Sequence, residues 1–421
     1  MTSITRSPAH CVFALIIVTA LLAVRGISSR DPGSWFFDPS AAYNLIYTAH
    51  RQRQAERFIA LASDVAPFRS RNTTASLCLG IPSVARDDGR YLHITIGSLL
   101  AGLTTEERDA MHVKVLIAHT TPEVHPAYHE VWLPNVVDEI LLYNLSKAEY
   151  AHVAELEHQK GLYREKGLFD YRYLLSACRT TEASYIAMIE DDVVALDGWY
   201  HRTMNGLRQA EQRSKPAYGE GRDNFLYLRL FYTEQFLGWN AEEWPIHTFW
   251  SIVSISMTAV AVFGVRQLFP SSKGVLTPGL SVSICAIVVP LLIILTFAAG
   301  KTTVFPLKSG IVRMDNYGCC AQGLVYPSHK ADELIQWYDN SRVGFADMLT
   351  EEYADAHKEQ RWSLTPSVLQ HVGARSSKTD DFVPDNGHSR HTSRHIWNFG
   401  FELNKAQVLE QEHALAVLQG S

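Results

Sequence analysis

The sequence carries little charge and no excess of basic residues. Of its 421 residues, 38 are Lys or Arg and 44 are Asp or Glu, so the formal net charge is −6. Only 19% of the residues are charged, whereas 47% are hydrophobic. Disordered chains combine low hydrophobicity with high net charge, and nucleic-acid-binding domains concentrate Lys and Arg. Neither description applies, so we expect a folded protein without a nucleic-acid partner.

Several well-known site motifs are also missing. The chain has no C-x-x-C zinc spacing, no H-E-x-x-H, no G-x-x-x-x-G-K-S/T and no G-x-S-x-G. These absences remove support from metalloprotease, ATPase and serine-hydrolase functions. Three histidines near the end are separated by Arg and Ser and have no Cys beside them, which favours a solvated loop over a zinc site. They are His388, His391 and His395.

Three stretches contain no charged residue, and they predict membrane-spanning helices. They are residues 7–24, 244–265 and 274–300. A spanning helix needs about 20 apolar residues, a length that the second and third stretches reach and the first approaches. The short connector 266–273 has two basic residues and no acid, which favours a cytoplasmic turn between two spans. The alternative for this hairpin is a pair of core helices in a soluble protein.

The first uncharged stretch has two interpretations, a cleaved signal peptide or an uncleaved anchor. No small-x-small cleavage site precedes Arg25, so we predict a signal anchor over residues 1–25. Asn72 and Asn144 each begin an N-x-S/T glycosylation triplet, and both lie between the first and second predicted spans. This arrangement predicts a cytosolic N-terminus, with the segments on both sides of the hairpin in the secretory lumen.

The segments outside the predicted spans have the sequence pattern of an α/β domain. Short apolar strands alternate with helical patterns, which is typical of a largely parallel, Rossmann-like sheet with helices on both faces. The predicted strands are 76–81, 113–118, 140–143 and 185–189, and the predicted helices are 91–103 and 171–178. We predict a lumenal helical stem over residues 26–75 and a transmembrane hairpin over residues 244–300. The hairpin divides the domain into a first part, residues 76–243, and a second part, residues 301–421.

Three consecutive acids, Glu190, Asp191 and Asp192, follow the strand predicted at 185–189. Ligands of α/β sheets bind at the carboxyl ends of strands. Adjacent carboxylates in a partly buried site repel one another unless a cation lies among them. Carboxylates are hard oxygen ligands suited to Mg²⁺ or Mn²⁺. We therefore predict a divalent metal site here, the alternative being a solvated acidic turn.

Four of the six cysteines lie outside the predicted spans, where oxidation is possible. They are Cys78, Cys178, Cys319 and Cys320. Three pairings are open, although we do not expect the adjacent Cys319 and Cys320 to bond to each other. Cys78 and Cys178 have the alternative of being small buried hydrophobic residues.

Several stretches resemble known glycosyltransferases. Residues 185–194, YIAMIEDDVV, look like the strand and D-x-D-type motif of GT-A glycosyltransferases, which hold a nucleotide sugar through a metal. Residues 79–84, 166–171 and 366–377 are similar, in the same order, to motifs of the N-acetylglucosaminyltransferase IV family. That family has no hairpin within its catalytic domain. A GT-A-like domain split by a transmembrane hairpin resembles instead the family of GPI side-chain N-acetylgalactosaminyltransferases.

The resemblance implies a metal-dependent, inverting transfer of a sugar, an N-acetylhexosamine, from a UDP-sugar to the glycan of a GPI anchor. It further implies a multi-pass protein of the Golgi or endoplasmic-reticulum membrane, with Mn²⁺ or Mg²⁺ as cofactor. A hairpin in the lipid bilayer would keep the active site near an acceptor that begins at the membrane surface. Two alternatives stay open: an N-glycan N-acetylglucosaminyltransferase, and a non-catalytic membrane scaffold.

The resemblance also implies roles for particular residues. Asp192 would bind the metal, with Glu190 and Asp191 reaching the metal, the ribose or the sugar. His371, in the Q-H-V-G stretch, would complete the metal or diphosphate site, although a single His is often only a structural hydrogen-bonding group.

Further candidates follow from the same resemblance. Lys166 and Asp170 would face the nucleotide, and Arg375 and Ser376 could contact phosphate oxygens, unless these two belong to ordinary solvated surface. An inverting transfer also needs a carboxylate base, for which Asp347 and Glu243 compete. The sequence does not decide between these two acids.

Overall fold

The computed structural model describes residues 8–64, 75–86, 90–159, 161–214, 225–314, 319–373 and 396–420. Contacts between residues divide the chain into two compact units. The smaller unit is Met1–Asn44 with Glu234–Pro306, and the larger unit is Leu45–Thr233 with Leu307–Ser421. Each unit is therefore assembled from two separate segments of the chain.

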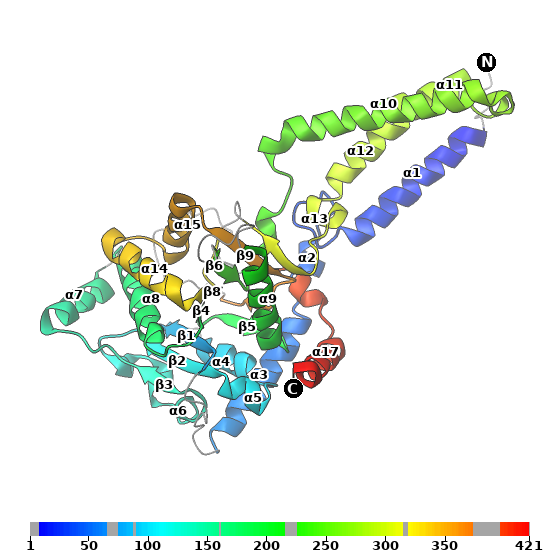
Figure 1. Cartoon of the computed structure of the whole chain (residues 1–421). Coiled ribbons are helices and arrows are strands. Elements are labelled where there is room, and N and C mark those ends of the chain that lie inside the picture. Colours follow the sequence, from blue (N-terminus) through cyan, green and yellow to red (C-terminus); the bar gives the residue numbers. More distant parts are fainter. Residues whose placement is uncertain are drawn as a thin grey trace. The chain divides into compact units, whose positions relative to one another are not determined.

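The larger unit is built on an eight-stranded mixed sheet with the order β3-β2-β1-β4-β8-β6-β9-β7 (Figure 1). Pairing is parallel from β3 through β4 and between β6 and β9, whereas β8 runs antiparallel to both β4 and β6, and β7 runs antiparallel to β9. The strands are β1 (Leu77–Ser83), β2 (Met111–Ile117), β3 (Glu139–Leu141), β4 (Tyr185–Ile189), β6 (Phe225–Arg229), β7 (Gly310–Arg313), β8 (Gly323–Pro327) and β9 (Gln360–Thr365). The predicted α/β class and parallel-rich sheet are confirmed.

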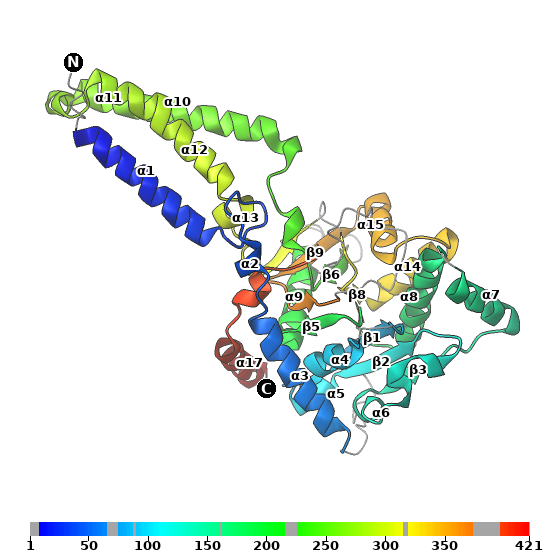
Figure 2. The same cartoon turned by 180° about the vertical axis from the view of Figure 1, so that it is seen from behind.

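Helices cover both faces of this sheet (Figures 1 and 2). The alternation of side chains along β1 sends Leu77, Leu79 and Ile81 into one apolar core and Cys78 into the other. The first core lies under α3 (Tyr47–Ala62), α4 (Leu92–Leu100) and α9 (Trp199–Ser214), and the second lies under α8 (Tyr163–Arg179), α14 (Ser328–Ser341) and α15 (Ala346–His357). The remaining helices of this unit are α5 (Thr105–Asp109), α6 (Leu133–Val136), α7 (Lys147–His158) and α17 (Ala406–Gly420).

Helix α3 is packed closely against α4 (Figure 2). A Cβ added at Gly97 of α4 would lie 2.7 Å from the backbone oxygen of Ala55, so the two helices approach within a distance that only glycine permits. Arg51 of α3 is buried, and its guanidinium donates to the backbone oxygens of Ser98 and Ala195 at 2.6 and 2.8 Å. These bonds tie α3 to the core of the larger unit.

The smaller unit contains two helices that are long and apolar enough to cross a membrane. They fall within residues 234–268 and 278–298, with mean hydropathies of 1.8 and 2.7 over their most apolar windows. Few residues of these windows are buried, which fits lipid-facing helices better than core helices of a soluble protein. The helices of this unit are α1 (Pro8–Ile27), α2 (Pro39–Ala42), α10 (Trp244–Leu268), α11 (Pro278–Ser283), α12 (Val289–Ala298) and α13 (Lys301–Val304).

Helix α1 coincides with the first uncharged stretch and contacts α12 (Figure 1). Its residues Leu15–Ile27 form an apolar helical stretch, and nothing in the structure tests whether α1 crosses a membrane. The signal anchor therefore stays a prediction.

Two disulfides join the four cysteines outside the spans. Cys78 of β1 is bonded to Cys178 of α8, and both are fully buried. Cys319 is bonded to Cys320, so the expectation that these neighbours do not pair was wrong. Side chains normally alternate along an extended chain, but Cys320 has a φ of +89°, which breaks the alternation and brings the two sulfur atoms together.

Candidate active site

The three acids form the turn that leaves the central strand β4. A two-stranded sheet of β5 (Val193–Ala195) and β10 (Leu369–His371) follows, in which His371 lies opposite Val193. This antiparallel pairing brings the late histidine to the acidic turn, with 3.5 Å between His371 Nε2 and Asp192 Oδ2. The Thr95 hydroxyl accepts the backbone N–H of Val193 at 3.1 Å and anchors the turn from α4.

Asp191 and Asp192 differ in their partners. Asp191 accepts the Ser83 hydroxyl at 2.5 Å and the Arg86 guanidinium at 2.8 Å, one on each carboxylate oxygen. Asp192 Oδ2 lies 3.5 Å from both Arg86 and His371, whereas its Oδ1 is buried without a hydrogen-bond partner. Each oxygen of Asp191 therefore already has one protein partner, whereas Asp192 keeps an oxygen without any.

The protonation equilibria of this cluster follow from burial and charge. Burial raises the pKa of Asp191 even though Arg86 opposes this effect. Burial also disfavours the charged form of Asp192, but the neighbouring His371 and Arg86 outweigh it and lower the pKa of Asp192. Asp192 in turn raises the pKa of His371 against the effect of burial. Asp192 is thus held as a carboxylate at neutral pH.

A cavity of about 330 Å³ opens at this turn. That volume is in the range of small-molecule sites, and the cavity lies where strand ends of an α/β sheet bind ligands. Six of the predicted site residues line this cavity, and two of them, Asp170 and Asp347, come from α8 and α15. Its polar and charged lining comprises Arg86, Tyr163, Arg164, Asp170, Tyr171, Glu190, Asp191, Asp192, Gln322, Asp347 and His371.

Lys166 and Asp170 lie one turn apart on α8 and form a buried ion pair at 2.8 Å. Lys166 Nζ also donates to the Tyr143 hydroxyl at 2.7 Å and to the Ala118 backbone oxygen at 2.9 Å. Burial raises the pKa of Asp170, although Lys166 opposes the shift. Asp170 reaches the cavity wall, whereas Lys166 lies behind it and holds the carboxylate in place.

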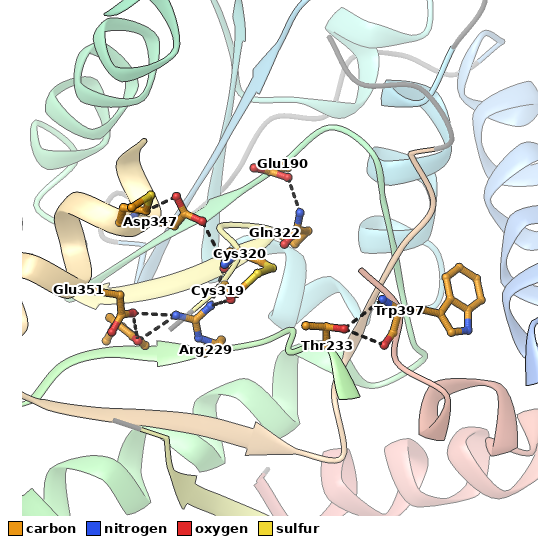
Figure 3. Close-up of a disulfide and its surroundings, with 11 residues drawn as sticks. Glu190, Arg229, Thr233, Cys319, Cys320, Gln322, Asp347, Glu351 and Trp397 are labelled. Carbon is orange, nitrogen blue, oxygen red and sulfur yellow. Dashed lines mark hydrogen bonds and ion pairs between the residues drawn. A yellow bond between two sulfur atoms is a disulfide. The ribbon is translucent and has the colours of Figure 1, made fainter. Parts of the chain in front are cut away.

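Asp347 lies in the first turn of α15, where a negative charge is favoured by the helix dipole. Its Oδ2 accepts the backbone N–H of Cys320 at 3.1 Å (Figure 3). The buried Arg229 supports this peptide from the other side, donating to the backbone oxygens of Cys319 and Cys320 and pairing with Glu351 at 2.8 Å. The disulfide-linked pair and Asp347 therefore form one wall of the cavity.

Glu190 is held by the side chain of Gln322, whose Nε2 donates to its Oε2 at 2.9 Å (Figure 3). Glu243 belongs to the smaller unit, where it pairs with Lys301 at 2.9 Å and lies 3.5 Å from His247. It is not among the residues that line the cavity. Arg375, Ser376 and the three tail histidines lie outside the described residues.

The acidic turn suits a divalent cation in its donor chemistry. Asp192 supplies an unpartnered buried oxygen, Oδ1, and Gly373 leaves space beside its other oxygen, because a Cβ there would lie 2.2 Å from Asp192 Oδ2. Carboxylate oxygens and an imidazole fit Mn²⁺ or Mg²⁺. Among the described residues, however, the group that already brings three ligand atoms within 4.8 Å of one another is Glu107, His201 and His413, at a different place.

Sequence reasoning missed Ser83, Arg86, Gln322 and Gly373. Ser83 and Arg86 follow the apolar part of β1, so the rule that ligands bind at carboxyl ends of strands would have indicated them had it been applied to β1 as well as β4. Gln322 precedes β8. This strand lies antiparallel between β4 and β6, a placement that no local sequence pattern predicts. Gly373 is one glycine among 25 and shows its importance only through its neighbours.

The α/β sheet and its acidic cavity at a strand end define a protein with a candidate site for a small-molecule ligand. The comparisons with known proteins make this class specific. Residues 77–370, more than half of the chain, match the family described as "GPI-N-acetylgalactosamine transferase PGAP4". The chain belongs to this family and is a glycosyltransferase.

Curated relatives outside the family agree with this class. The chain is similar to alpha-1,3-mannosyl-glycoprotein 4-beta-N-acetylglucosaminyltransferase B of Mus musculus, 31% identical over 134 residues, and to that of Homo sapiens, 30% identical over 134 residues. Each match covers 29% of this chain and 24% of the relative, so the chain spans about a quarter of the length of these enzymes. A glycosyltransferase family and two candidate membrane helices together fit a membrane-bound enzyme of the secretory pathway.

Proposed function

We propose that this enzyme transfers an N-acetylhexosamine from a UDP-sugar to the glycan of a GPI anchor, with inversion and with Mn²⁺ or Mg²⁺ as cofactor. The observation that carries the proposal is the composition of the cavity. Glu190, Asp191 and Asp192 come from the chain before the predicted hairpin, and Asp347 and His371 come from the chain after it. A family match that continues across the same interruption supports a single GT-A-like domain.

The metal would be held by Asp192, Glu190 and His371, and when bound it supplies Lewis-acid stabilisation of the leaving diphosphate. The protein's own groups do the remaining work. Asp170, held by Lys166, would face the nucleotide from α8. Asp191, with both oxygens bonded to Ser83 and Arg86, would accept a ribose or sugar hydroxyl at the edge of the metal site.

Asp347 is the better candidate for the base. It lies on the cavity wall, and its Oδ2 accepts the backbone N–H of Cys320. In an inverting transfer the acceptor hydroxyl attacks the anomeric carbon while its proton passes to Asp347, and the bond to the UDP oxygen breaks on the opposite face of the sugar. Glu243 already has Lys301 and His247 as partners in the smaller unit.

A membrane hairpin within the enzyme would suit an acceptor that is itself attached to lipid. We propose that the protein is a multi-pass component of the Golgi or endoplasmic-reticulum membrane and that both parts of its catalytic domain are lumenal. The limited similarity to N-acetylglucosaminyltransferases leaves an N-glycan acceptor as the competing function.

Cells that lack this enzyme, complemented with the full-length wild type or with Asp192→Asn, provide the test. Mass spectrometry of released GPI glycans and of N-glycans from the same cells identifies the acceptor. We expect the wild type to restore a hexosamine side chain on GPI glycans only, and Asp192→Asn to restore little of it at equal protein abundance. Equal restoration by both would identify a scaffold, and a change confined to N-glycans would identify the competing function.

A further inference from the structure

A second cluster of histidine and carboxylate side chains joins three helices of the larger unit, separate from the cavity described above. Glu107 comes from α5, His201 from α9 and His413 from α17, and one ligand atom of each lies within 4.8 Å of the other two. Glu107 and His413 are buried, and His201 is partly buried. None of these residues lines the candidate active site.

We propose that Glu107, His201 and His413 bind a zinc ion that fastens helix α17 to α5 and α9. Two imidazoles and a carboxylate are ligands that zinc accepts readily, at about 2.0–2.2 Å from each donor atom. Zinc binding requires these donor atoms, now within 4.8 Å of one another, to close on a common centre. The fourth position of such a site is taken by water.

The surroundings of His413 are those of a metal-binding histidine. Its Nδ1 lies 3.0 Å from Asp197 Oδ1, and its Nε2 lies 2.9 Å from Glu107 Oε2. A carboxylate that accepts the N–H of one ring nitrogen fixes the tautomer and aims the other nitrogen at the metal. Asp197 performs this role for His413, and the capping box of α5, in which Glu107 Oε2 accepts the Thr104 N–H at 3.0 Å, fixes the Glu107 side chain.

His201 supplies the second, independent observation. Its Nδ1 is buried and has no hydrogen-bond partner, although a buried ring nitrogen normally has one. Gly198 makes room for this ring, because a Cβ there would lie 2.9 Å from His201 Nδ1. The His201 ring stacks on that of His413, with ring centroids 5.3 Å apart. Two imidazoles side by side are favourable when both are neutral metal ligands.

The charges of the cluster also favour a divalent cation. Glu412 bonds to Arg202 at 2.6 and 2.8 Å and lies 3.6 Å from His201 Nε2, whereas Glu107 and Asp197 both bond to the imidazole of His413. Zinc would replace the proton on Nε2, releasing it to solvent, and balance both carboxylates.

Zinc binding to the full-length enzyme in detergent provides the test, measured by equilibrium dialysis against buffered Zn²⁺ and elemental analysis. All variants are made in a chain with His388→Ala, His391→Ala and His395→Ala, which removes the tail histidines as zinc ligands. We expect one zinc ion per chain, and at least about tenfold weaker binding in His201→Gln. His201→Gln leaves the His413 bonds to Glu107 and Asp197 in place, so it removes a ligand without removing the ion-pair network.

Three further variants complete the comparison. Asp197→Asn weakens zinc binding about 10- to 100-fold, the usual effect of losing a group that orients a ligand. His158→Gln, an exposed histidine of α7, leaves binding unchanged. Asp192→Asn abolishes sugar transfer and retains this zinc ion, so the two sites fail separately. Absence of stoichiometric zinc in the parent chain, or equal binding by the parent and His201→Gln, would overturn the proposal and leave only a charged hydrogen-bond network.

Discussion

The two aspartates at the end of β4 are neighbours in sequence but have different chemical surroundings. Asp191 is bonded on both oxygens, to Ser83 and to Arg86, and Asp192 retains a buried oxygen without a partner. A metal or substrate group can bind Asp192 without displacing a protein hydrogen bond, whereas at Asp191 it must compete. This difference is the reason for assigning the metal to Asp192.

Replacing Gly373 by alanine tests the space beside the other carboxylate oxygen of Asp192, Oδ2. The new Cβ would lie 2.2 Å from Asp192 Oδ2 and 2.9 Å from His371 Nε2, so one of these groups must move. Since displacing a catalytic group by about 1 Å can cost on the order of 100-fold in rate, we expect a loss of roughly that size in kcat for sugar transfer. Gly264→Ala in α10, where a Cβ has no atom within 4 Å, serves as the matched control. An unchanged kcat in Gly373→Ala would show that Asp192 and His371 do not belong to the catalytic site.

Neutralising the two candidate bases separately distinguishes them. We expect Asp347→Asn to lower kcat by about 10²- to 10⁴-fold with little effect on the KM for the donor, because the proton acceptor is lost and the donor site is kept. Glu243→Gln should cost far less, since Glu243 pairs with Lys301 in the smaller unit. Steady-state kinetics of both variants decides, and the reverse ranking would assign the base to Glu243.

The acids were predicted as a site because three adjacent carboxylates follow an apolar strand, and His371 was predicted from its resemblance to a glycosyltransferase motif; the structure places them side by side, and their roles stay predictions. Sequence alone could not locate Ser83, Arg86 or Gln322, which are ordinary polar residues in loops until the fold brings them to the acids. A site can be recognised from sequence when its residues are close together in the chain. Ser83, Arg86 and Gln322 are distant from the acids in sequence, and only strand pairing brings them near.

At the scale of elements, strand pairing assembles the site. The pairing of β10 with β5 places His371 opposite Val193, across a gap of more than 170 residues in sequence. The strands up to β4 were predicted from local apolar runs, and β4 was predicted at its observed bounds. The insertion of β8 between β4 and β6 was not predicted, because antiparallel pairing between distant segments leaves no periodic signal in either.

Helix α3 offers a stability test at this scale. Arg51→Met removes the guanidinium that donates to the backbone oxygens of Ser98 and Ala195, leaving buried acceptors without partners. We expect a loss of about 3 kcal/mol in the free energy of unfolding. Arg53→Met, on the exposed face of the same helix, should change it by less than about 0.5 kcal/mol. Denaturant unfolding of the two variants measures the difference, and similar values would mean that Arg51 is not anchored as described.

At the scale of the whole molecule, the disulfide between Cys78 and Cys178 indicates the compartment. Disulfides persist in oxidising compartments such as the secretory lumen. The bond closes a loop of sequence separation 100 and joins β1 to α8, the helix that carries Asp170. It therefore agrees with a lumenal catalytic domain. Asn144, one of the two predicted glycosylation acceptors, is exposed in the same unit.

Removing this bond should destabilise the larger unit. We expect Cys78→Ala with Cys178→Ala to lower the free energy of unfolding by about 2–5 kcal/mol, since the unfolded chain gains conformational freedom. Denaturant unfolding without and with a reductant measures the effect. A reductant should weaken the wild type more than the double variant, which keeps only the Cys319–Cys320 disulfide. If the two proteins unfold alike without reductant, the bond is absent from the mature enzyme.

The division of the larger unit also has a consequence for biosynthesis. Both sheet neighbours of β6, namely β8 and β9, are translated only after the two candidate spans. Until the ribosome has delivered them, β4 and β6 present open edges and α8 lacks its partner α14. The sheet of the nascent enzyme therefore stays incomplete until the chain after the two candidate spans has been made, and exposed strand edges of this kind depend on chaperones for protection against aggregation.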